Sequence, residues 1–299
     1  MDGPGPAAPY PAHWEADVVL SDGATAHLRP IRPDDADRLV EFYGRVSDES
    51  KYFRFFAPYP TLSARDVEKF TQVDHVDRVA LIMLIGDDMI AVSPYERLDT
   101  HQAEVAFLVE DAHQSRGIGS IMLEHLAQAA RERGIGKFVA ETLAQNDKMI
   151  TVFGEAGYTM ASRLADGVIH VAFEIGPTDH SIQVMTAREH RAEARSIQRL
   201  LTPRSVAVIG ASRSRDKVGH ALVRNLVRGG FTGPVYAVNP DATAVSGVPA
   251  YPNVRDVPGE VDLAVVAVPA EAVTDVVLDC AAKGVKGLVV LSAGFAETG

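Results

Sequence analysis

Hydrophobic residues dominate three neighbouring stretches between residues 79 and 109, which read VALIMLIG, MIAVSPYERL and AEVAFLV. Short apolar and β-branched runs bounded by turn residues are typical of strands, and Gly86-Asp87-Asp88 supplies the first turn. We therefore predict an antiparallel meander of three strands. Two stretches before it, residues 32–46 and 62–73, have the apolar spacing of helices, and Ser63 is positioned to cap the second one.

Alternating elements continue after the meander. Apolar residues at positions 118, 121, 122, 126 and 129 fall on one face of a helix that ends near Gly134. Residues 137–143 predict a strand, residues 146–158 a short helix closed by Gly157, and residues 168–175 a last strand. These elements indicate an α/β domain with a mixed, largely antiparallel sheet over residues 21–178. A flexible tail rich in Pro, Gly and Ala is expected over residues 1–20.

From Ser205 onward the strand-like runs become continuously apolar. They cover residues 205–210, 234–240, 261–269 and 287–295, with helical patterns at 219–230 and 271–284 between them. Continuous apolar strands that alternate with helices are typical of βαβ units in a parallel sheet. We predict a Rossmann-like parallel α/β domain over residues 202–299, incomplete at its C-terminus. A polar linker that becomes helical joins the two domains over residues 179–201.

Composition and charge narrow the classes of function. The 299 residues carry a formal net charge of -11, which provides no basic field for a nucleic acid or an anionic membrane, and we expect neither partner. No run approaches the ~18 apolar residues of a membrane span. Cys280 is the single cysteine, and the N-terminus is unlike a signal peptide, which together favour the cytoplasm. The ten histidines show no metal-ligand spacing, so we expect no metal site.

The stretch His113-Gln-Ser-Arg-Gly-Ile-Gly-Ser120 follows the meander and opens the next helix. The first amides of a helix have no partner within the helix, and its dipole favours an anion at that end. Gly117 and Gly119 would let the backbone approach a phosphate, and Arg116 could add a charge-assisted contact. A plain strand-to-helix connection has the same pattern, so the turn alone leaves both interpretations open.

Other motifs agree with the phosphate-binding interpretation. Gln114-x-x-Gly117-x-Gly119 after a strand, Asn146 after the next strand and VFGEAGY at 152–158 resemble the GNAT acyltransferase superfamily over roughly residues 24–175. The resemblance implies that the turn holds the pyrophosphate of acetyl-CoA, that the preceding strand pairs with the pantetheine arm, and that Asn146 contacts this arm. The implied acetyl-CoA residues are Leu108, Val109, Gln114, Arg116, Gly117, Ile118, Gly119, Ser120, Asn146 and Phe153.

The resemblance also indicates the catalytic chemistry. A lysine ammonium, with a pKa of ~10.4, must lose a proton before it can attack a thioester. Glu104 resembles the strand glutamate that acts as the base in lysine-acetylating members, although an exposed strand glutamate without a catalytic role has the same pattern. A backbone amide of this strand is expected to stabilise the oxyanion. Where many members carry a tyrosine that protonates the leaving thiolate, this chain has Phe153, so the thiolate leaves unassisted or another group donates.

An aromatic segment, SDESKYFRFFAPYP at 47–60, lies between the two early helices. Its simplest interpretation is a buried aromatic cluster. In GNAT folds this region shapes the acceptor groove, so a role in substrate choice is the alternative. The segment also resembles a motif of bacterial protein acetyltransferases of the Pat type.

A second glycine turn lies in SVAVIGASRSRDKVGHAL at 205–222. It departs from the Gly-x-Gly-x-x-Gly pattern of an NAD site, and its basic loop suits the phosphates of CoA better. With VNP at 238–240, AVPA at 267–270 and SAGFAE at 292–297, it resembles the CoA-binding domain of NDP-forming acyl-CoA synthetases from about residue 202 onward. The implied CoA residues are Gly210, Ser212, Arg213, Lys217, Gly219, Asn239, Pro240 and Pro269.

A GNAT domain fused to such a CoA-binding domain resembles bacterial protein lysine acetyltransferases of the Pat type. The resemblance implies direct acetyl transfer from acetyl-CoA to a lysine of an AMP-forming acyl-CoA synthetase, with Glu104 as the base. The second domain is then a CoA or acyl-CoA binding module with a possible regulatory role. Two alternatives stay open: a catalytically inactive acyl-CoA sensor, and a fragment of an NDP-forming acyl-CoA synthetase.

Overall fold

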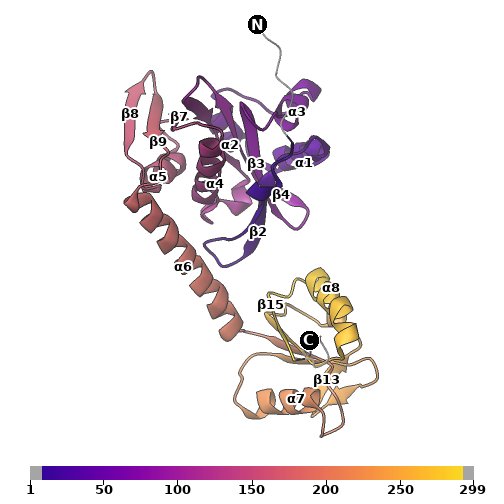
Figure 1. The fold of residues 1–299 in the computed structure, drawn as a ribbon. Coiled ribbons are helices and arrows are strands. Elements are labelled where there is room, and N and C mark those ends of the chain that lie inside the picture. Colours follow the sequence, from indigo (N-terminus) through magenta and orange to yellow (C-terminus); the bar gives the residue numbers. More distant parts are fainter. Residues whose placement is uncertain (1–8, 292–299) are drawn as a thin grey trace. The chain divides into compact units, whose positions relative to one another are not determined.

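A computed structural model of the chain describes residues 9–291. The chain divides into two compact units, residues 1–194 and 195–299, and each is described by itself. Figure 1 follows the chain through both units. Among the described residues, no helix combines the length and the apolar character that crossing a membrane requires.

The first unit contains one mixed sheet in the order β1-β2-β3-β4-β5-β7-β9-β8, with β6 paired to β4. Neighbouring strands pair antiparallel except β5 and β7, which are parallel. The largely antiparallel sheet that the sequence predicted is therefore confirmed. The strands are β1 (Ala16–Val19), β2 (Thr25–Pro30), β3 (Arg78–Ile85), β4 (Asp88–Arg97), β5 (Gln102–Val105), β6 (Leu108–Val109), β7 (Lys137–Leu143), β8 (Met160–Ala165) and β9 (Val168–Glu174).

Helices cover both faces of this sheet. They are α1 (Ala36–Arg45), α2 (Asp48–Phe55), α3 (Ala64–Thr71), α4 (Ile118–Glu132) and α5 (Asp147–Glu155), with short 3-10 turns at Ala12–Trp14, Pro33–Asp35 and Asp111–His113. The predicted cap is confirmed, because the Ser63 hydroxyl accepts a hydrogen bond from the Asp66 amide at 3.2 Å. The sequence prediction missed α2. This helix begins after Ser47, whose hydroxyl accepts from the Ser50 amide.

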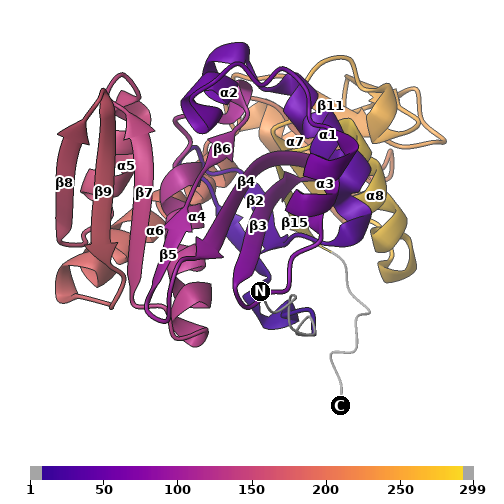
Figure 2. The ribbon, with the colours of Figure 1, turned by 90° about the horizontal axis from the view of Figure 1, so that it is seen from above.

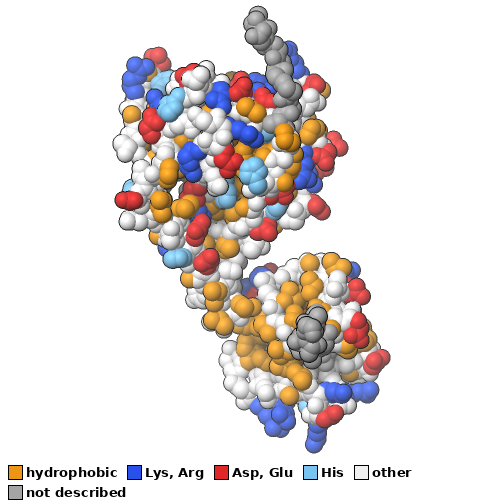
Figure 3. Space-filling view, in the orientation of Figure 1, with side chains coloured by type: hydrophobic (Ala, Val, Ile, Leu, Met, Phe, Trp, Pro, Cys, Tyr) orange, Lys and Arg blue, Asp and Glu red, His pale blue; other side chains and the backbone are white. Residues whose placement is uncertain are grey.

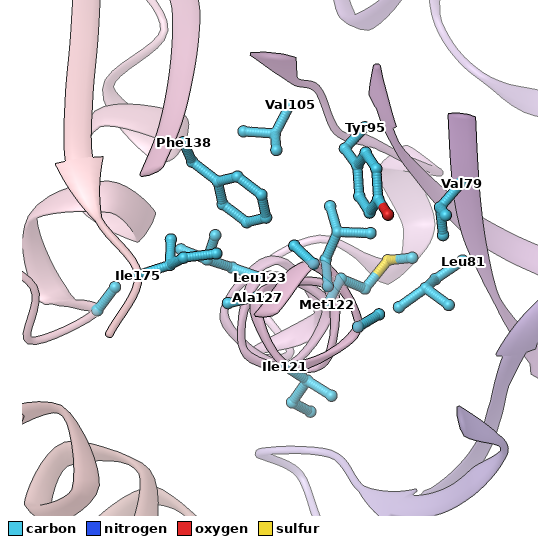
Figure 4. Close-up of a cluster of buried hydrophobic side chains, with 14 of the residues drawn as sticks. Val79, Leu81, Tyr95, Val105, Ile121, Met122, Leu123, Ala127, Phe138 and Ile175 are labelled. Carbon is cyan, nitrogen blue, oxygen red and sulfur yellow. The ribbon is translucent and has the colours of Figure 1, made fainter. Parts of the chain in front are cut away.

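Two hydrophobic clusters hold the helices to the sheet. One lies on the α4 face and is built around Ile121, Met122 and Leu123 of α4 together with strand residues such as Leu81 and Phe138. Figure 4 shows Met122 and Leu123 of the helix facing Leu81 and Phe138 of the sheet, with Ile121 on another side of the helix. The other cluster lies on the α1 face and includes residues of α1, β3 and β4. Burial on both faces keeps the sheet rigid where the site described below is built.

The predicted flexible tail over residues 1–20 is wrong for its described part. Trp14 and Leu20 are buried, and residues 16–19 form β1, which pairs with β2. The indole of Trp14 also donates to the Glu132 carboxylate at 2.7 Å. The Pro-rich and Gly-rich composition of the first residues hid the apolar run that follows them. Residues 1–8 lie outside the described part of the chain.

The predicted third strand of the meander is interrupted in the structure. β5 ends at Val105 and β6 begins at Leu108, although both pair with β4 in one register. The amide of Ala106 donates to the Pro94 carbonyl at 3.1 Å, but Pro94 has no N–H to return the bond. The Ser93 hydroxyl donates to the Ala106 carbonyl instead, at 2.9 Å. Pro94 therefore breaks the strand without shifting its register.

The second unit is a parallel sheet in the order β12-β13-β11-β10-β14-β15, apart from the antiparallel hairpin of β12 and β13. The predicted Rossmann-like parallel sheet is thus confirmed, whereas the hairpin was not predicted. The elements are α6 (Asp179–Leu201), β10 (Val206–Ile209), α7 (Val218–Arg228), β11 (Val235–Val238), β12 (Ala244–Val245), β13 (Val248–Tyr251), β14 (Leu263–Val266), α8 (Val273–Lys283) and β15 (Gly287–Val290). Helix α6 begins in the first unit, and the SAGFAE segment lies outside the described residues.

Candidate active site

A cavity of about 620 Å³ opens in the first unit where two strands separate. β5 and β7 pair only as far as Glu104 and Val139, and β6 pairs with β4 alone. Figure 2 shows β7 diverging from β6 beyond this point. Helix α2 contacts both β6 and β7 and contributes to the cavity wall. The predicted site residues on its lining are Glu104, Leu108, Val109, Gln114, Gly117, Ile118, Gly119, Ser120, Asn146 and Phe153.

The edge of β6 that faces the cavity has backbone groups that no strand pairs with, although the Val109 carbonyl accepts from the Gln114 side chain at 3.2 Å. The Ala106 amide donates to the Pro94 carbonyl, and the Glu110 amide donates to the Ile90 carbonyl. The backbone groups of the even-numbered residues in this stretch therefore point toward β4. Since an antiparallel ladder alternates, the backbone of Phe107 and Val109 points the other way, toward the diverging β7. An extended amide-containing ligand could pair with this edge as an additional strand. The sequence prediction named Leu108 and Val109, but not Phe107.

The turn before α4 presents free backbone amides to the cavity. Gly117 has a φ of 78°, and its carbonyl accepts the first bond of the helix, from the Ile121 amide at 3.1 Å. The amides of residues 118–120 precede that bond and have no partner within the helix. A side chain at Gly119 would lie 3.0 Å from a methyl group of Val152 on α5. The two glycines therefore have different roles, one conformational and one in packing α4 against α5.

Gln114 and Asp111 tie the turn to α2. The side-chain nitrogen (Nε2) of Gln114 donates to the Val109 carbonyl at 3.2 Å and to the Ser50 hydroxyl at 3.1 Å. The Asp111 carboxylate accepts from the Ser47 amide and from the Ser47 and Ser50 hydroxyls, each at 2.8 Å. Burial raises the pKa of Asp111, but these hydrogen bonds outweigh it and hold that pKa below its usual value. This network fixes α2 over the cavity.

Lys148, and not Arg116, is the cation that lines the cavity beside the glycine turn. The Arg116 guanidinium pairs with Asp22, Nη2 to Oδ2 at 2.9 Å, and with His113, and it does not line the cavity. Lys148 lies in the first turn of α5, lines the cavity and donates to the Gln114 side-chain oxygen at 2.6 Å. The sequence prediction missed Lys148, although its place two residues after Asn146 was a usable signal.

Asn146 and Phe153 both belong to the α5 side of the cavity. The Asn146 side-chain oxygen caps α5 by accepting from the Met149 amide at 3.2 Å, so its NH₂ group is what it can offer to a ligand. Phe153 is buried, with its ring 5.9 Å from that of Phe107 and 5.7 Å from that of Phe173. It forms an apolar wall and has no proton to donate.

A second cavity of about 160 Å³ meets the first one at Glu104. The residues common to both linings are Arg54, Glu104, Val105, Ala106 and Leu108. Apart from these, the smaller cavity is largely apolar, with Glu96 and two cations, Lys69 and Arg78, on its wall. Glu96 lies directly opposite Glu104 in the pairing of β4 and β5. Glu104 therefore lies at the junction, and Glu96 lies beside it on the same face, within the smaller cavity.

Arg54 and its aromatic neighbours on α2 correct one prediction. The four rings of Tyr52, Phe53, Phe55 and Phe56 are not a buried cluster, because Tyr52 is 42% exposed and the others are half-buried. Phe53 and Phe56 line the larger cavity. Burial lowers the pKa of the Arg54 guanidinium while the nearby Glu104 carboxylate opposes that shift, and the side chain stays charged.

The second unit gathers its predicted residues at the carboxyl ends of the parallel strands. β10 pairs with β11 on one side and with β14 on the other, which makes its carboxyl end the position where ligands bind in such sheets. Gly210 follows β10, the segment beginning at Asn239 follows β11, and Pro269 follows β14. The predicted residues there are Gly210, Ser212, Arg213, Lys217, Gly219, Asn239, Pro240 and Pro269.

The loop that follows β10 packs closely on its neighbours. A Cβ on Gly210 would lie 2.3 Å from the Ala267 carbonyl oxygen, and one on Gly219 would lie 2.1 Å from that of Gly210. The Asn239 side chain donates to the Ala211 carbonyl at 2.5 Å. Arg213 and Lys217 are exposed, and Figure 3 shows Lys and Arg side chains along the edge of this unit where α7 lies. The loop is therefore rigid in its backbone and positive at its surface.

Comparisons with known proteins match each unit to a different family. The acetyltransferase (GNAT) domain model matches residues 26–159, and the CoA binding domain model matches residues 204–298. A crystal structure of the GNAT domain of PAT from S. lividans is 58% identical, covers 55% of this chain and 99% of its own, and superposes with a TM-score of 0.53.

The curated relatives reported next each match between a third and two fifths of this chain. Acetate–CoA ligase [ADP-forming] II from Archaeoglobus fulgidus is 50% identical over 100 residues, which are 33% of this chain and 15% of that protein. An acetyltransferase from Pseudomonas aeruginosa is 27% identical over 124 residues, which are 40% of this chain and 66% of that protein. The chain thus spans only 14% to 23% of the length of the ligases named among its curated relatives.

Proposed function

The chain belongs to the GNAT acetyltransferase family and carries a CoA-binding domain like those of ADP-forming acetate–CoA ligases, and from this premise we propose that it acetylates a lysine of a partner protein. The acceptor that we propose is an AMP-forming acyl-CoA synthetase, and the acetyl group comes directly from acetyl-CoA. The observation that carries the proposal is the meeting of the two cavities at Glu104.

The larger cavity has the groups that acetyl-CoA requires. Its pyrophosphate would be held by the free amides of residues 118–120 and by Lys148. The pantetheine arm would pair with the open edge at Phe107 and Val109, and the Asn146 NH₂ group would contact it. This arrangement directs the thioester toward the connection between β5 and β6, where Glu104 lies.

The smaller cavity suits the acceptor. A lysine side chain has an apolar stem and a charged end, which match the apolar wall and the two carboxylates of the smaller cavity. Glu104 takes a proton from the ammonium, and the neutral amine attacks the thioester carbonyl. The attacking nitrogen then loses its second proton to water, the C–S bond breaks with its electron pair staying on sulfur, and CoA leaves. A backbone amide of the β5–β6 connection stabilises the oxyanion.

We propose that the second unit binds CoA or acyl-CoA through the loop of residues 210–219. Its backbone amides and the exposed Arg213 and Lys217 suit phosphate groups. A regulatory effect on the first unit is part of the proposal, and it requires that the CoA affinity of one unit change when the other is occupied.

The alternative of an inactive acyl-CoA sensor draws on Phe153, which cannot protonate a thiolate. One experiment separates it from the enzyme. The chain is mixed with acetyl-CoA and an AMP-forming acyl-CoA synthetase, free thiol release is followed, and acetyl-lysine is located by mass spectrometry. Acetylation that is lost when the modified lysine is replaced by arginine supports the proposed function. Binding of acetyl-CoA without thiol release above the rate of buffer would establish the sensor.

A further inference from the structure

A buried hydroxyl without a partner lies on the wall of the acetyl-CoA cavity. Thr142, near the end of β7, is 1% exposed, and its Oγ1 makes no hydrogen bond with any described group of the protein. Buried polar side chains in folded proteins nearly always have a partner, because leaving one without a partner is unfavourable. Thr142 lines the larger cavity, so a bound ligand can supply the missing partner.

The position of Thr142 corresponds to one part of that ligand. Continuing the parallel register of Glu104 and Val139 along the diverging strands brings Thr142 level with Phe107. Phe107 in turn contacts Phe153. Thr142 therefore lies in the same stretch of the cavity as Phe153.

Thr142 and Glu104 belong to opposite faces of the sheet. Val105, Phe107 and Val109 pack in the cluster on the α4 face, so the alternating Glu104 and Leu108 face the α1 side. On β7, Phe138 and Ala140 belong to the α4 cluster, and Thr142 continues their alternation. A thioester between β6 and β7 would have the base on one face and the hydroxyl on the other.

We propose that the Thr142 hydroxyl donates a hydrogen bond to the sulfur of acetyl-CoA as the C–S bond breaks. The proposal rests on the proposed function and names the group that takes over from the missing tyrosine. The electron pair of the C–S bond goes to sulfur, the hydroxyl keeps its own proton, and the thiolate takes a proton from water after release. Thr142 thus stabilises the leaving thiolate without acting as an acid.

The first test uses Thr142→Val, which keeps the shape of the side chain and removes the hydroxyl, with Thr142→Ser as the rescue. We expect Thr142→Val to slow transfer in a single turnover by roughly 10- to 100-fold and Thr142→Ser to restore most of the rate. The melting temperature should not fall, because the hydroxyl has no partner in the free protein. Thr151→Val is the matched control. It makes the same substitution, but at a hydroxyl that already donates to the Asp147 carbonyl at 2.8 Å.

The second test does not depend on acetyl transfer. A thiol with a pKa of ~8.5 ionises as the pH rises, so a donor at sulfur should make CoA bind more tightly at pH 9 than at pH 7. We expect this gain in the wild type and its loss in Thr142→Val, measured by calorimetry. Desulfo-CoA, which lacks the sulfur, should bind both proteins equally at both pH values.

The outcomes separate the two proposals. If lysine transfer fails but the pH-dependent gain is present only in the wild type, the proposed function is wrong and the Thr142 contact stands. Equal pH dependence in both proteins overturns the Thr142 proposal, whatever the rate of transfer. A clear fall in the melting temperature of Thr142→Val, or equally weakened binding of desulfo-CoA, also overturns it, since the hydroxyl would then serve the fold or another part of the ligand.

Discussion

The guanidinium of Arg116 pairs with the carboxylate of Asp22, Nη2 to Oδ2 at 2.9 Å, and so the arginine of the glycine turn is directed away from the cavity that the turn borders. Lys148 of α5 lies on that cavity instead and hydrogen-bonds to Gln114. The positive charge near the free amides of α4 thus comes from a residue outside the glycine motif.

Because Lys148 and not Arg116 lies on the cavity, removing the charge of each residue should have a different effect. Arg116→Gln should leave the dissociation constant of acetyl-CoA within about threefold and reduce stability by under about 1 kcal/mol, because its ion pair is partly exposed. Lys148→Gln should weaken binding by roughly 3- to 10-fold and reduce its dependence on salt. Calorimetric titration at two salt concentrations measures both effects. A larger loss for Arg116→Gln would show that Arg116 leaves Asp22 when the ligand binds.

The two glycines of the turn should respond differently to alanine. Gly117→Ala places a side chain at a φ of 78°, which costs about 1–2 kcal/mol for a residue with a Cβ. Gly119→Ala meets a Val152 methyl at 3.0 Å, but alanine is favoured over glycine within a helix by about 1 kcal/mol, so the effects largely cancel. Thermal unfolding should therefore show a lower melting temperature for Gly117→Ala. A larger decrease for Gly119→Ala would contradict this assignment.

At the opposite end of the second sheet from its proposed ligand site, Asp262 should matter for stability alone. A hydrogen bond from Lys286 lowers the pKa of Asp262 to about 2 against the opposing effect of burial, with further bonds from Arg204. A carboxyl whose folded pKa is depressed stabilises the fold above its unfolded pKa of ~3.9 and loses that contribution as the pH falls toward 2.

We therefore expect Asp262→Asn to be less stable than the wild type by on the order of 1–2 kcal/mol at pH 7, with the difference shrinking between pH 4 and pH 2. Hydrogen exchange of the β10 and β14 amides measures this locally. The CoA affinity of the second unit should not change. A difference in stability that is independent of pH would show that the carboxylate charge is not what stabilises this end of the sheet.

The basic loop of the second unit has its own matched control. Arg213→Gln with Lys217→Gln should weaken CoA binding by roughly tenfold, because two positive charges are removed from the loop that is proposed to hold the phosphates. Arg224→Gln with Arg228→Gln removes the same charge from exposed positions further along α7 and should have little effect. CoA binding is measured on the whole chain, and occupation of the second site is followed separately by hydrogen exchange of the amides of residues 210–219. Equal losses for the two pairs would indicate a general charge effect.

The limits of sequence-based prediction are visible in particular residues. The apolar pattern predicted β3, β4, β7, α4 and the parallel sheet, because each of these buries its apolar face against neighbours in the same unit. The glycine turn likewise predicted that residues 117–120 would open a helix beside a cavity. Such elements can be predicted because the residues that form them are neighbours in the sequence.

Other features depend on contacts between residues far apart in the chain. Ser47, Asp48 and Glu49 are a usual helix start, but the aromatic residues that follow suggested a buried cluster, and α2 is held over the cavity by Asp111. The pairing of Arg116 with Asp22 is equally non-local. The sequence shows that Pro94 lies in a predicted strand. The break that it causes between β5 and β6 can be understood only once the pairing of Pro94 with Ala106 is known.

The assignment of Glu104 as the base is the central claim, and its cross-strand neighbour Glu96 provides the control. Both carboxylates line the smaller cavity, so either substitution removes the same charge from the same face of the sheet. The decisive measurement is single-turnover acetylation of the acceptor synthetase by Glu104→Gln and Glu96→Gln, with acetyl-CoA binding measured alongside. We expect Glu104→Gln to lose ~10²-fold or more while still binding acetyl-CoA, and Glu96→Gln to lose less than about fivefold. Equal rates for the two variants would contradict the role of Glu104 as the base.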